Sequence, residues 1–147
     1  AGRMAASVLG VPFWDTDEMV ESDAGASIAE IWAKDGEDAF RDLESSVVAR
    51  LSGEEGIVAT GGGAVLDPAN REAMSGVVVW LTASPDTVAG RIDPAGRPLL
   101  AGAPVAVGIA RLQGAREHIY ERLADHTLAT DGLDLRTVAD RIARLWL

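Results

Sequence analysis

Short apolar runs alternate with longer amphipathic segments along this chain. The runs, each bounded by turn residues, lie at 11–14, 57–59, 77–81 and, more weakly, 127–130. Their length and their bounding residues are typical of strands. Because continuous apolar strands joined by helices form parallel sheets that are covered on both faces, the pattern predicts an α/β fold.

Helix-start signals stand between the predicted strands. Ser27, followed three residues later by Glu30, forms a capping box. Two further N-cap residues precede a proline at the first helical position, in Asp67-Pro68 and Ser84-Pro85. Asp134 is the expected cap of the last helix, whose apolar residues share one face: Leu135, Val138, Ala139, Ile142 and Leu145. We expect this helix to pack on the sheet.

The length of 147 residues fits one domain spanning 1–147, without an internal repeat or linker. Hydrophobic residues make up 48% and charged residues 24%, which is ordinary for a soluble protein, and no apolar run approaches the roughly eighteen residues of a membrane span. The first residues lack the basic and apolar regions of a secretory signal, so we expect a cytoplasmic location. The absence of cysteine leaves oxygen ligands and arginines for any chemistry.

The chain is acidic, with a formal net charge of −10 and a pI near 4.5. This balance argues against binding to nucleic acid, whose phosphates require a basic face. The charge is uneven, because residues 1–60 hold thirteen acids and four bases, whereas residues 91–122 hold five arginines and three acids. An arginine-bearing segment facing an acidic one suits an enzyme that handles Mg2+ and polyphosphate, although a solvated amphipathic helix gives similar counts.

Two carboxylates, Asp15 and Asp17, follow the first apolar run. In an open parallel sheet, ligands bind beyond the carboxyl ends of the strands, so these acids are well placed for a metal ion or a substrate hydroxyl. The alternative is a helix start in which Thr16 is the N-cap and Asp17 and Glu18 complement the helix dipole. The acids alone favour the helix start.

Three consecutive glycines, Gly61, Gly62 and Gly63, follow the second apolar run. A backbone without side chains lets a ligand approach closely, and a turn that needs positive φ would also select glycine. The triplet is not a phosphate-binding P-loop, which requires Gly, four residues and then Gly-Lys-Ser/Thr. The single lysine of the chain, Lys34, is followed by Asp35, so these 147 residues hold no Walker A sequence.

Arginines supply the remaining candidate chemistry. Arg41 and Glu44 are three residues apart beside an apolar helix stripe, which suits either a solvated salt bridge or a carboxylate-binding arginine held by Glu44. Arg97 lies in the breaker-rich segment 93–106, which is either a lid or a plain surface loop. Arg116 lies in a predicted helix with Tyr120 four residues on.

Taken together, these residues resemble the shikimate kinase family, in the same order over nearly the whole chain. The matching stretches are Gly10 to Phe13 with Asp15-Thr16-Asp17, Gly25 with Ser27 to Ile31, Gly36-Glu37 with Phe40-Arg41 and Glu44, Gly61 to Val65, Arg97 to Leu100, and Arg116 with Tyr120. The resemblance implies a P-loop NTPase-like, three-layer α/β/α fold with a parallel sheet. It also implies that ATP, with Mg2+, phosphorylates the 3-hydroxyl of shikimate, a step toward chorismate and the aromatic amino acids.

The resemblance assigns roles residue by residue. Asp17 would contact the reacting hydroxyl and act as base, and Asp15 would lie in the Mg2+ environment. Arg97 would be the lid arginine on the ATP phosphates. The shikimate ring and carboxylate would be held by Arg41, Arg116, Gly61, Gly62 and Gly63, with Glu44 orienting Arg41. The shikimate-binding region would span about 15–63 and the lid about 93–106, in a monomer that binds neither nucleic acid nor membrane.

The chain departs from the family pattern at its start. Family members begin with a central strand, a Walker A loop and a helix, and Gly2-Arg3 and Ala5 match positions inside that helix. The first strand is therefore absent from the predicted sheet, and we expect these 147 residues to be marginally folded and to lack normal kinase activity. The alternatives are a non-catalytic pseudokinase that binds shikimate or a partner, and another small-molecule P-loop kinase such as a gluconate kinase.

Overall fold

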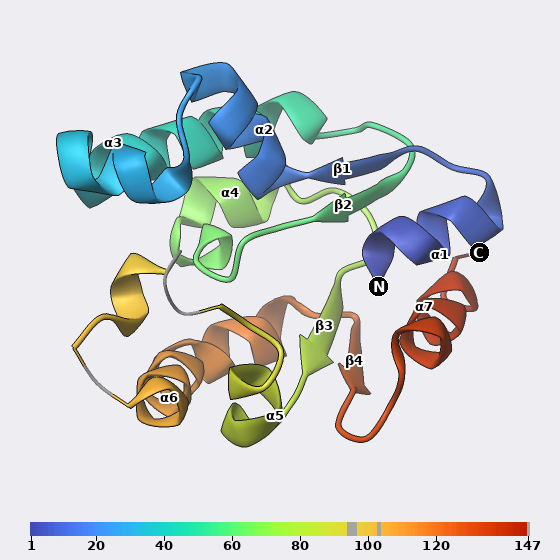
Figure 1. Cartoon of the computed structure of the whole chain (residues 1–147). Helices are drawn as coiled ribbons and strands as arrows, with labels where there is room; N and C mark the ends of the chain where they lie inside the picture. Colours follow the sequence, from blue (N-terminus) through green and yellow to red (C-terminus); the bar gives the residue numbers. More distant parts are fainter. Residues whose placement is uncertain (94–96, 103, 147) are drawn as a thin grey trace.

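The computed structural model describes residues 1–93, 97–102 and 104–146 (Figure 1). Its helices are α1 (Gly2–Leu9), α2 (Thr16–Ala24), α3 (Ile28–Leu51), α4 (Pro68–Ala73), α5 (Pro85–Ala89), α6 (Val105–Leu123) and α7 (Leu135–Ala143). Its strands are β1 (Phe13–Asp15), β2 (Ile57–Ala59), β3 (Val79–Thr82) and β4 (His126–Ala129). Short 3-10 turns lie at η1 (Ala64–Leu66) and η3 (Pro98–Leu100).

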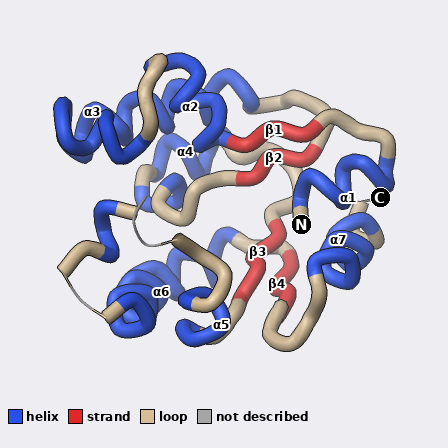
Figure 2. The backbone as a smooth tube through the Cα atoms, in the orientation of Figure 1, coloured by secondary structure: helices blue, strands red, loops and turns tan. Residues whose placement is uncertain are grey.

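The four strands form two parallel pairs. In one pair Phe13 lies opposite Ile57, and in the other Val79 lies opposite His126. Within the described residues no strand joins β2 to β3 (Figure 2). The predicted α/β class and the parallel pairing are confirmed.

The second strand has the predicted bounds, 57–59, and the other three strands differ from their predicted bounds by one or two residues. The first strand begins at Phe13 rather than at position 11, because Pro12 has no N–H and contributes only its carbonyl, which accepts from the N–H of Ile57 at 2.9 Å. The third strand likewise begins two residues late, at Val79.

The elements divide into two halves that enclose the site. The first half (residues 1–76) holds β1 and β2 with α2, α3 and α4, and the second half (residues 77–146) holds β3 and β4 with α5 and α6 (Figure 1). The core of the first half forms where α3 packs on α2 and the strands, through Val20, Ile31, Phe40, Val47 and Leu51. This packing fixes the inner face of α3, from which the predicted Arg41 and Glu44 extend.

The predicted helix caps are confirmed. Ser27 Oγ accepts from the N–H of Glu30 at 3.2 Å, and Glu30 Oε2 accepts from the N–H of Ser27 at 2.7 Å. The side chains of Asp67, Ser84 and Asp134 accept from the first turns of α4, α5 and α7. None of the helices in the described ranges is long and apolar enough to cross a membrane.

The last helix has a neighbour that the sequence pattern did not predict. α7 packs against α1, beside which it lies in Figure 1. Val138 and Ala139 are buried there, whereas Leu135 is 55% exposed. Small buried residues on α1, Ala5 and Ala6, leave room for this close approach, so only a narrow stripe of α7 needs to be covered.

A kink at Gly36 divides α3 into two segments. Gly36 has φ 86° and ψ 178°, a conformation that only glycine adopts without strain. The segment before the kink runs from the capping box to Asp35, and the segment after it carries Arg41 and Glu44. Gly36 therefore sets the direction of the second segment, which faces the pocket.

We predict opposite effects for two glycine-to-alanine substitutions. Gly36→Ala should lower the free energy of unfolding by about 1 to 3 kcal/mol, because the kink requires its backbone conformation. Gly114→Ala, at an exposed position inside α6 with open space around it, should raise this free energy by up to about 1 kcal/mol. Urea denaturation of both variants measures the difference. Equal effects of the two substitutions would contradict the strained kink.

Candidate active site

An open pocket of about 580 Å³ lies between the two halves, at the carboxyl ends of the strands. All but one of the predicted site residues line it: Asp17, Arg41, Glu44, Gly61, Gly62, Gly63, Arg97 and Arg116. They come from α2, α3, the segment after β2, the residue before η3, and α6. The exception is Asp15. The structure thus brings the predicted residues together, and their individual roles stay predictions.

Asp15 is the N-cap of α2. Its Oδ1 accepts from the N–H of Asp17 at 2.9 Å and from that of Glu18 at 3.4 Å. The expectation that Thr16 would be the cap is wrong, because the helix starts one residue earlier, at Thr16 itself, directly after β1 ends at Asp15. Thr16 is instead fully buried, and its Oγ1 accepts from the N–H of Gly61 at 3.2 Å.

Asp17 faces the pocket from the first turn of α2. Burial raises the pKa of its carboxyl, and the neighbouring charge of Asp15 raises it further. The positive charges of Arg97 and Arg41 oppose this rise. A carboxylate in this setting holds a proton more readily than an exposed one, which suits a group that accepts a proton from a substrate.

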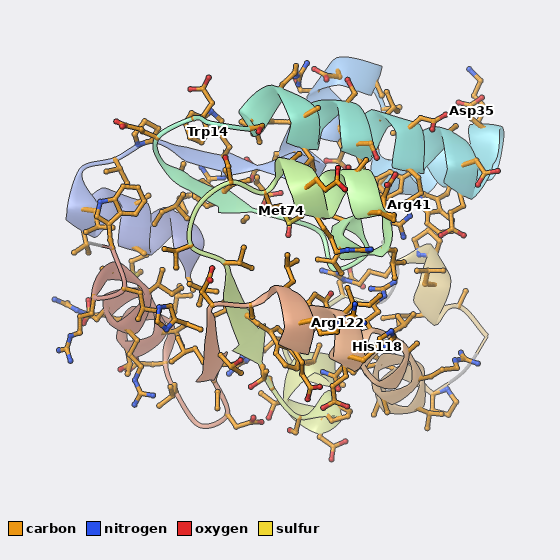
Figure 3. All side chains as sticks on the ribbon, turned by 180° about the vertical axis from the view of Figure 1, so that it is seen from behind. Trp14, Asp35, Arg41, Met74, His118 and Arg122 are labelled. Carbon is orange, nitrogen blue, oxygen red and sulfur yellow. The ribbon has the colours of Figure 1, made fainter. Side chains whose placement is uncertain are left out.

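Glu44 and Arg41 form an ion pair at the pocket wall. Arg41 Nη1 donates to Glu44 Oε1 at 2.8 Å, and Glu44 is only 1% exposed. Arg41 Nη2 also lies 3.4 Å from the exposed Glu37. Figure 3 shows Arg41 on the side of α3 that faces the other half of the molecule. Of the two interpretations from the sequence, the solvated salt bridge is therefore excluded by the burial of Glu44.

The glycine triplet lies where there is little room for side chains. None of its three residues has a positive φ, so a turn does not require glycine here. A Cβ on Gly61 would lie 3.0 Å from Asp17 Oδ1, and one on Gly63 would overlap the Arg41 guanidinium, 2.6 Å from Cζ. The backbone after β2 consequently packs directly against the charged groups of the pocket.

Tyr120 contacts the middle of the triplet and was assigned no role from the sequence. Its hydroxyl donates to the carbonyl of Gly62, and its ring stacks on Trp80 with centroids 5.4 Å apart. Together with Thr16, Tyr120 holds the triplet in place. Only two weak features of the sequence point to these residues: Thr16 lies between two acids, and Tyr120 lies one helical turn after Arg116.

Part of the predicted lid segment forms regular secondary structure. Residues 98–100 form η3, in which Leu100 is buried. Leu100 packs closely on α6, because a Cβ added at Gly108 would lie 3.1 Å from its side chain. α6 begins at Val105, inside the segment predicted as a loop. Residues 94–96 and 103 of the predicted lid lie outside the described residues.

The donors present do not make up a magnesium site. In the described part of the chain, no three side chains among His, Cys, Asp and Glu are grouped closely enough to hold a metal ion. In phosphotransferases Mg2+ is usually held by one or two carboxylates together with water and the substrate phosphates, so the side chains here would supply at most a small share of its ligands, with Asp15 already engaged as a helix cap. We therefore derive no chemical step from a metal held by these residues.

The fold and the site define a class of protein. A parallel α/β fold whose pocket combines a carboxylate, convergent arginines and a close-packed glycine strand end suits a small-molecule phosphotransferase. The family model described as "Shikimate kinase" matches residues 1–146. The chain belongs to the shikimate kinase family.

Curated relatives and solved structures agree with this assignment. A shikimate kinase of Symbiobacterium thermophilum is 44% identical over 147 residues, covering 96% of this chain and 84% of that protein. One of Pseudomonas fluorescens is 40% identical over 152 residues, covering 98% and 88%. The structure of an Acinetobacter baumannii shikimate kinase in complex with shikimate matches with a TM-score of 0.90 and 33% identity, covering 99% of this chain and 83% of that one. A Bacteroides thetaiotaomicron shikimate kinase matches with a TM-score of 0.83 and 28% identity, covering 99% and 89%.

We predict that Glu44 makes stability depend on pH. Burial raises the pKa of Glu44 above its ordinary value of 4.5, and the bond and charge of Arg41 oppose this rise. The folded state therefore binds more protons than the unfolded state just above pH 4.5, so the free energy of unfolding should fall as the pH rises through the folded-state pKa.

Glu44→Gln should remove this part of the slope above pH 4.5. Glu37→Gln should leave the slope unchanged, because Glu37 pairs with the same arginine but is exposed. Urea denaturation at several pH values measures the slopes. Identical slopes in the wild type and Glu44→Gln would show that the burial of Glu44 does not control the dependence.

Proposed function

We propose that this chain supplies the shikimate side of an ATP-dependent phosphorylation, in which the 3-hydroxyl of shikimate receives the phosphoryl group. The observation that carries the proposal is the convergence of Asp17, Arg41, the glycine triplet and Arg116 on one pocket, in a member of the shikimate kinase family. The high similarity to a structure solved with shikimate supports the same substrate.

Arg41 and Arg116 bind the substrate carboxylate in this proposal. They reach the pocket from α3 and α6, so a carboxylate between them would be held by both halves. Guanidinium groups bind carboxylates through charge-assisted, paired hydrogen bonds. The buried Glu44 holds Arg41 at 2.8 Å, which keeps the guanidinium oriented before the substrate arrives.

Asp17 receives the proton of the reacting hydroxyl in this proposal. The hydroxyl oxygen forms a new bond to the γ-phosphorus of ATP, the bond from that phosphorus to the β-phosphate oxygen breaks, and ADP leaves. The raised pKa of Asp17 supports its role as the acceptor of the proton. Gly61 lies beside Asp17 with its N–H bonded to Thr16, so the N–H groups of Gly62 and Gly63 are the ones that can orient the substrate ring.

Arg97 stabilises the transferred phosphoryl group in this proposal. It lines the pocket next to η3, and its charge acts on Asp17. A cation at this position offsets the negative charge on the equatorial oxygens of the phosphoryl group. The presence of Mg2+ with ATP, a place for Asp15 near it, a cytoplasmic location and a monomeric state stay predictions from the sequence.

A non-catalytic, shikimate-binding role is the second candidate function. The 147 residues hold no Gly-Lys-Ser/Thr, and their single lysine stands in Lys34-Asp35. The phosphates of ATP require such a loop in P-loop kinases. Substrate binding and phosphoryl transfer therefore need separate tests.

The first test is binding of shikimate to the 147-residue chain, measured by isothermal titration calorimetry. Arg41→Ala should raise the Kd about ten- to a hundredfold, because it removes charge-assisted hydrogen bonds to the carboxylate. Arg50→Ala is the matched control, since Arg50 lies on the same helix but pairs with Asp23 at the surface. Unchanged binding by Arg41→Ala would reject the proposed carboxylate site.

The second test is phosphoryl transfer. We expect no transfer to shikimate from ATP by the 147 residues alone. A chimaera in which they follow the first strand and Walker A loop of the family pattern should phosphorylate shikimate and not gluconate. In that chimaera Asp17→Asn should lower turnover about a hundredfold or more, and the exposed Asp42→Asn should leave it unchanged. Shikimate binding by a chimaera that transfers no phosphate would support the non-catalytic role instead.

A further inference from the structure

We infer that Tyr120 is a positioning residue that fixes the glycine triplet and Arg116 relative to each other, and thereby sets the shape of the substrate pocket. The inference rests on the proposed function, because it concerns the same shikimate site. It is carried by the contacts of a single hydroxyl group. Tyr120 is also the only tyrosine in the chain, so its substitution and its signals are unambiguous.

The Tyr120 hydroxyl has a polar neighbour on each of two sides. It donates to the carbonyl of Gly62, and the guanidinium of Arg116, one helical turn earlier on α6, lies beside it. A Cβ on Gly62 would lie 3.2 Å from both Arg116 Nη1 and the Tyr120 hydroxyl oxygen, so the three groups are in close contact. The hydroxyl therefore connects the predicted carboxylate-binding arginine to the triplet.

The bond to Gly62 also orients a backbone donor. The peptide between Gly62 and Gly63 is trans, so its C=O and its N–H point in opposite directions. Because the carbonyl is directed at Tyr120, the N–H of Gly63 is directed away from it. On the other flank, Thr16 Oγ1 accepts from the N–H of Gly61. With both flanks held, the peptide planes of the triplet have little freedom to rotate.

The tyrosine ring is itself held in place. It stacks on Trp80 of β3 at an interplanar angle of 17°. Burial raises the pKa of the phenol, with the charge and hydrogen bond of Arg116 opposing the rise, so the hydroxyl stays protonated at neutral pH and remains a donor to Gly62. Its ring and its hydroxyl thus act as a rigid spacer.

This spacer joins the two halves at the site. Tyr120, Trp80 and Arg116 belong to the second half, whereas Gly62 and Arg41 belong to the first. Arg41 and Arg116 must lie at a fixed separation to bind one carboxylate. The contact between Tyr120 and Gly62 fixes that separation, because a Cβ on Gly63, the next residue, would already overlap the Arg41 guanidinium.

The experiment compares shikimate binding by three full 147-residue proteins: the wild type, Tyr120→Phe and Asp134→Ala. Tyr120→Phe removes the hydroxyl and keeps a ring on Trp80, and we expect it to raise the Kd about fivefold, the effect of one lost hydrogen bond. Asp134→Ala removes the cap of the distant α7, which lowers stability without touching the pocket. Calorimetry gives the Kd, and the amide resonances of Gly62 and Gly63 report the orientation of the triplet.

The outcomes separate the inference from the proposed function. Weaker binding by Tyr120→Phe alone, together with shifted Gly62 and Gly63 amides, supports the positioning role. Wild-type binding by Tyr120→Phe overturns it, and equal weakening by Asp134→Ala also overturns it, because the effect would then follow stability. If the wild type itself binds no shikimate, the proposed function is overturned, and the positioning role for substrate falls with it.

Discussion

The buried carboxylate of Glu44 is the constraint on which the site depends. A charged group at 1% exposure is costly unless it is paired, and Arg41 supplies the partner at 2.8 Å. Glu44 Oε1 accepts the bond from Arg41, whereas Glu44 Oε2 has no hydrogen-bond partner within the described residues. The position of Arg41 in turn leaves no room for a side chain at Gly63. One buried acid thus determines an arginine and a glycine far apart in the sequence.

The pocket is a product of two separately built halves. Each half has its own pair of parallel strands, and the described residues contain no strand between them. Asp17, Arg41 and the triplet depend on the packing of α2 and α3 on β1 and β2, whereas Arg97 and Arg116 depend on η3 and α6. The distance between the halves is therefore as important to the site as the side chains that each half contributes.

Local features were predictable from the sequence, and long-range partners were not. The box of Ser27 and Glu30 depends on residues three positions apart, so its pattern is visible in the chain. The family resemblance identified Asp17, Arg41 and Arg116 as members of one pocket. The bond from Tyr120 to Gly62 spans 58 positions, and the packing of α7 on α1 joins opposite ends of the chain. Such contacts depend on how the helices are arranged around the strands, which periodicity does not specify.

The kink at Gly36 divides α3 into two parts that remain in contact. The part before it contributes Trp32 to the pocket wall, and the part after it contributes Arg41 and Glu44. The rings of Trp32 and Phe40 meet across the kink with centroids 5.9 Å apart, and the Arg41 guanidinium lies 5.1 Å from the Phe40 ring centroid. A change in the size of the wall residue therefore reaches the charged anchor through Phe40, so selection on one side of the pocket also acts on the other.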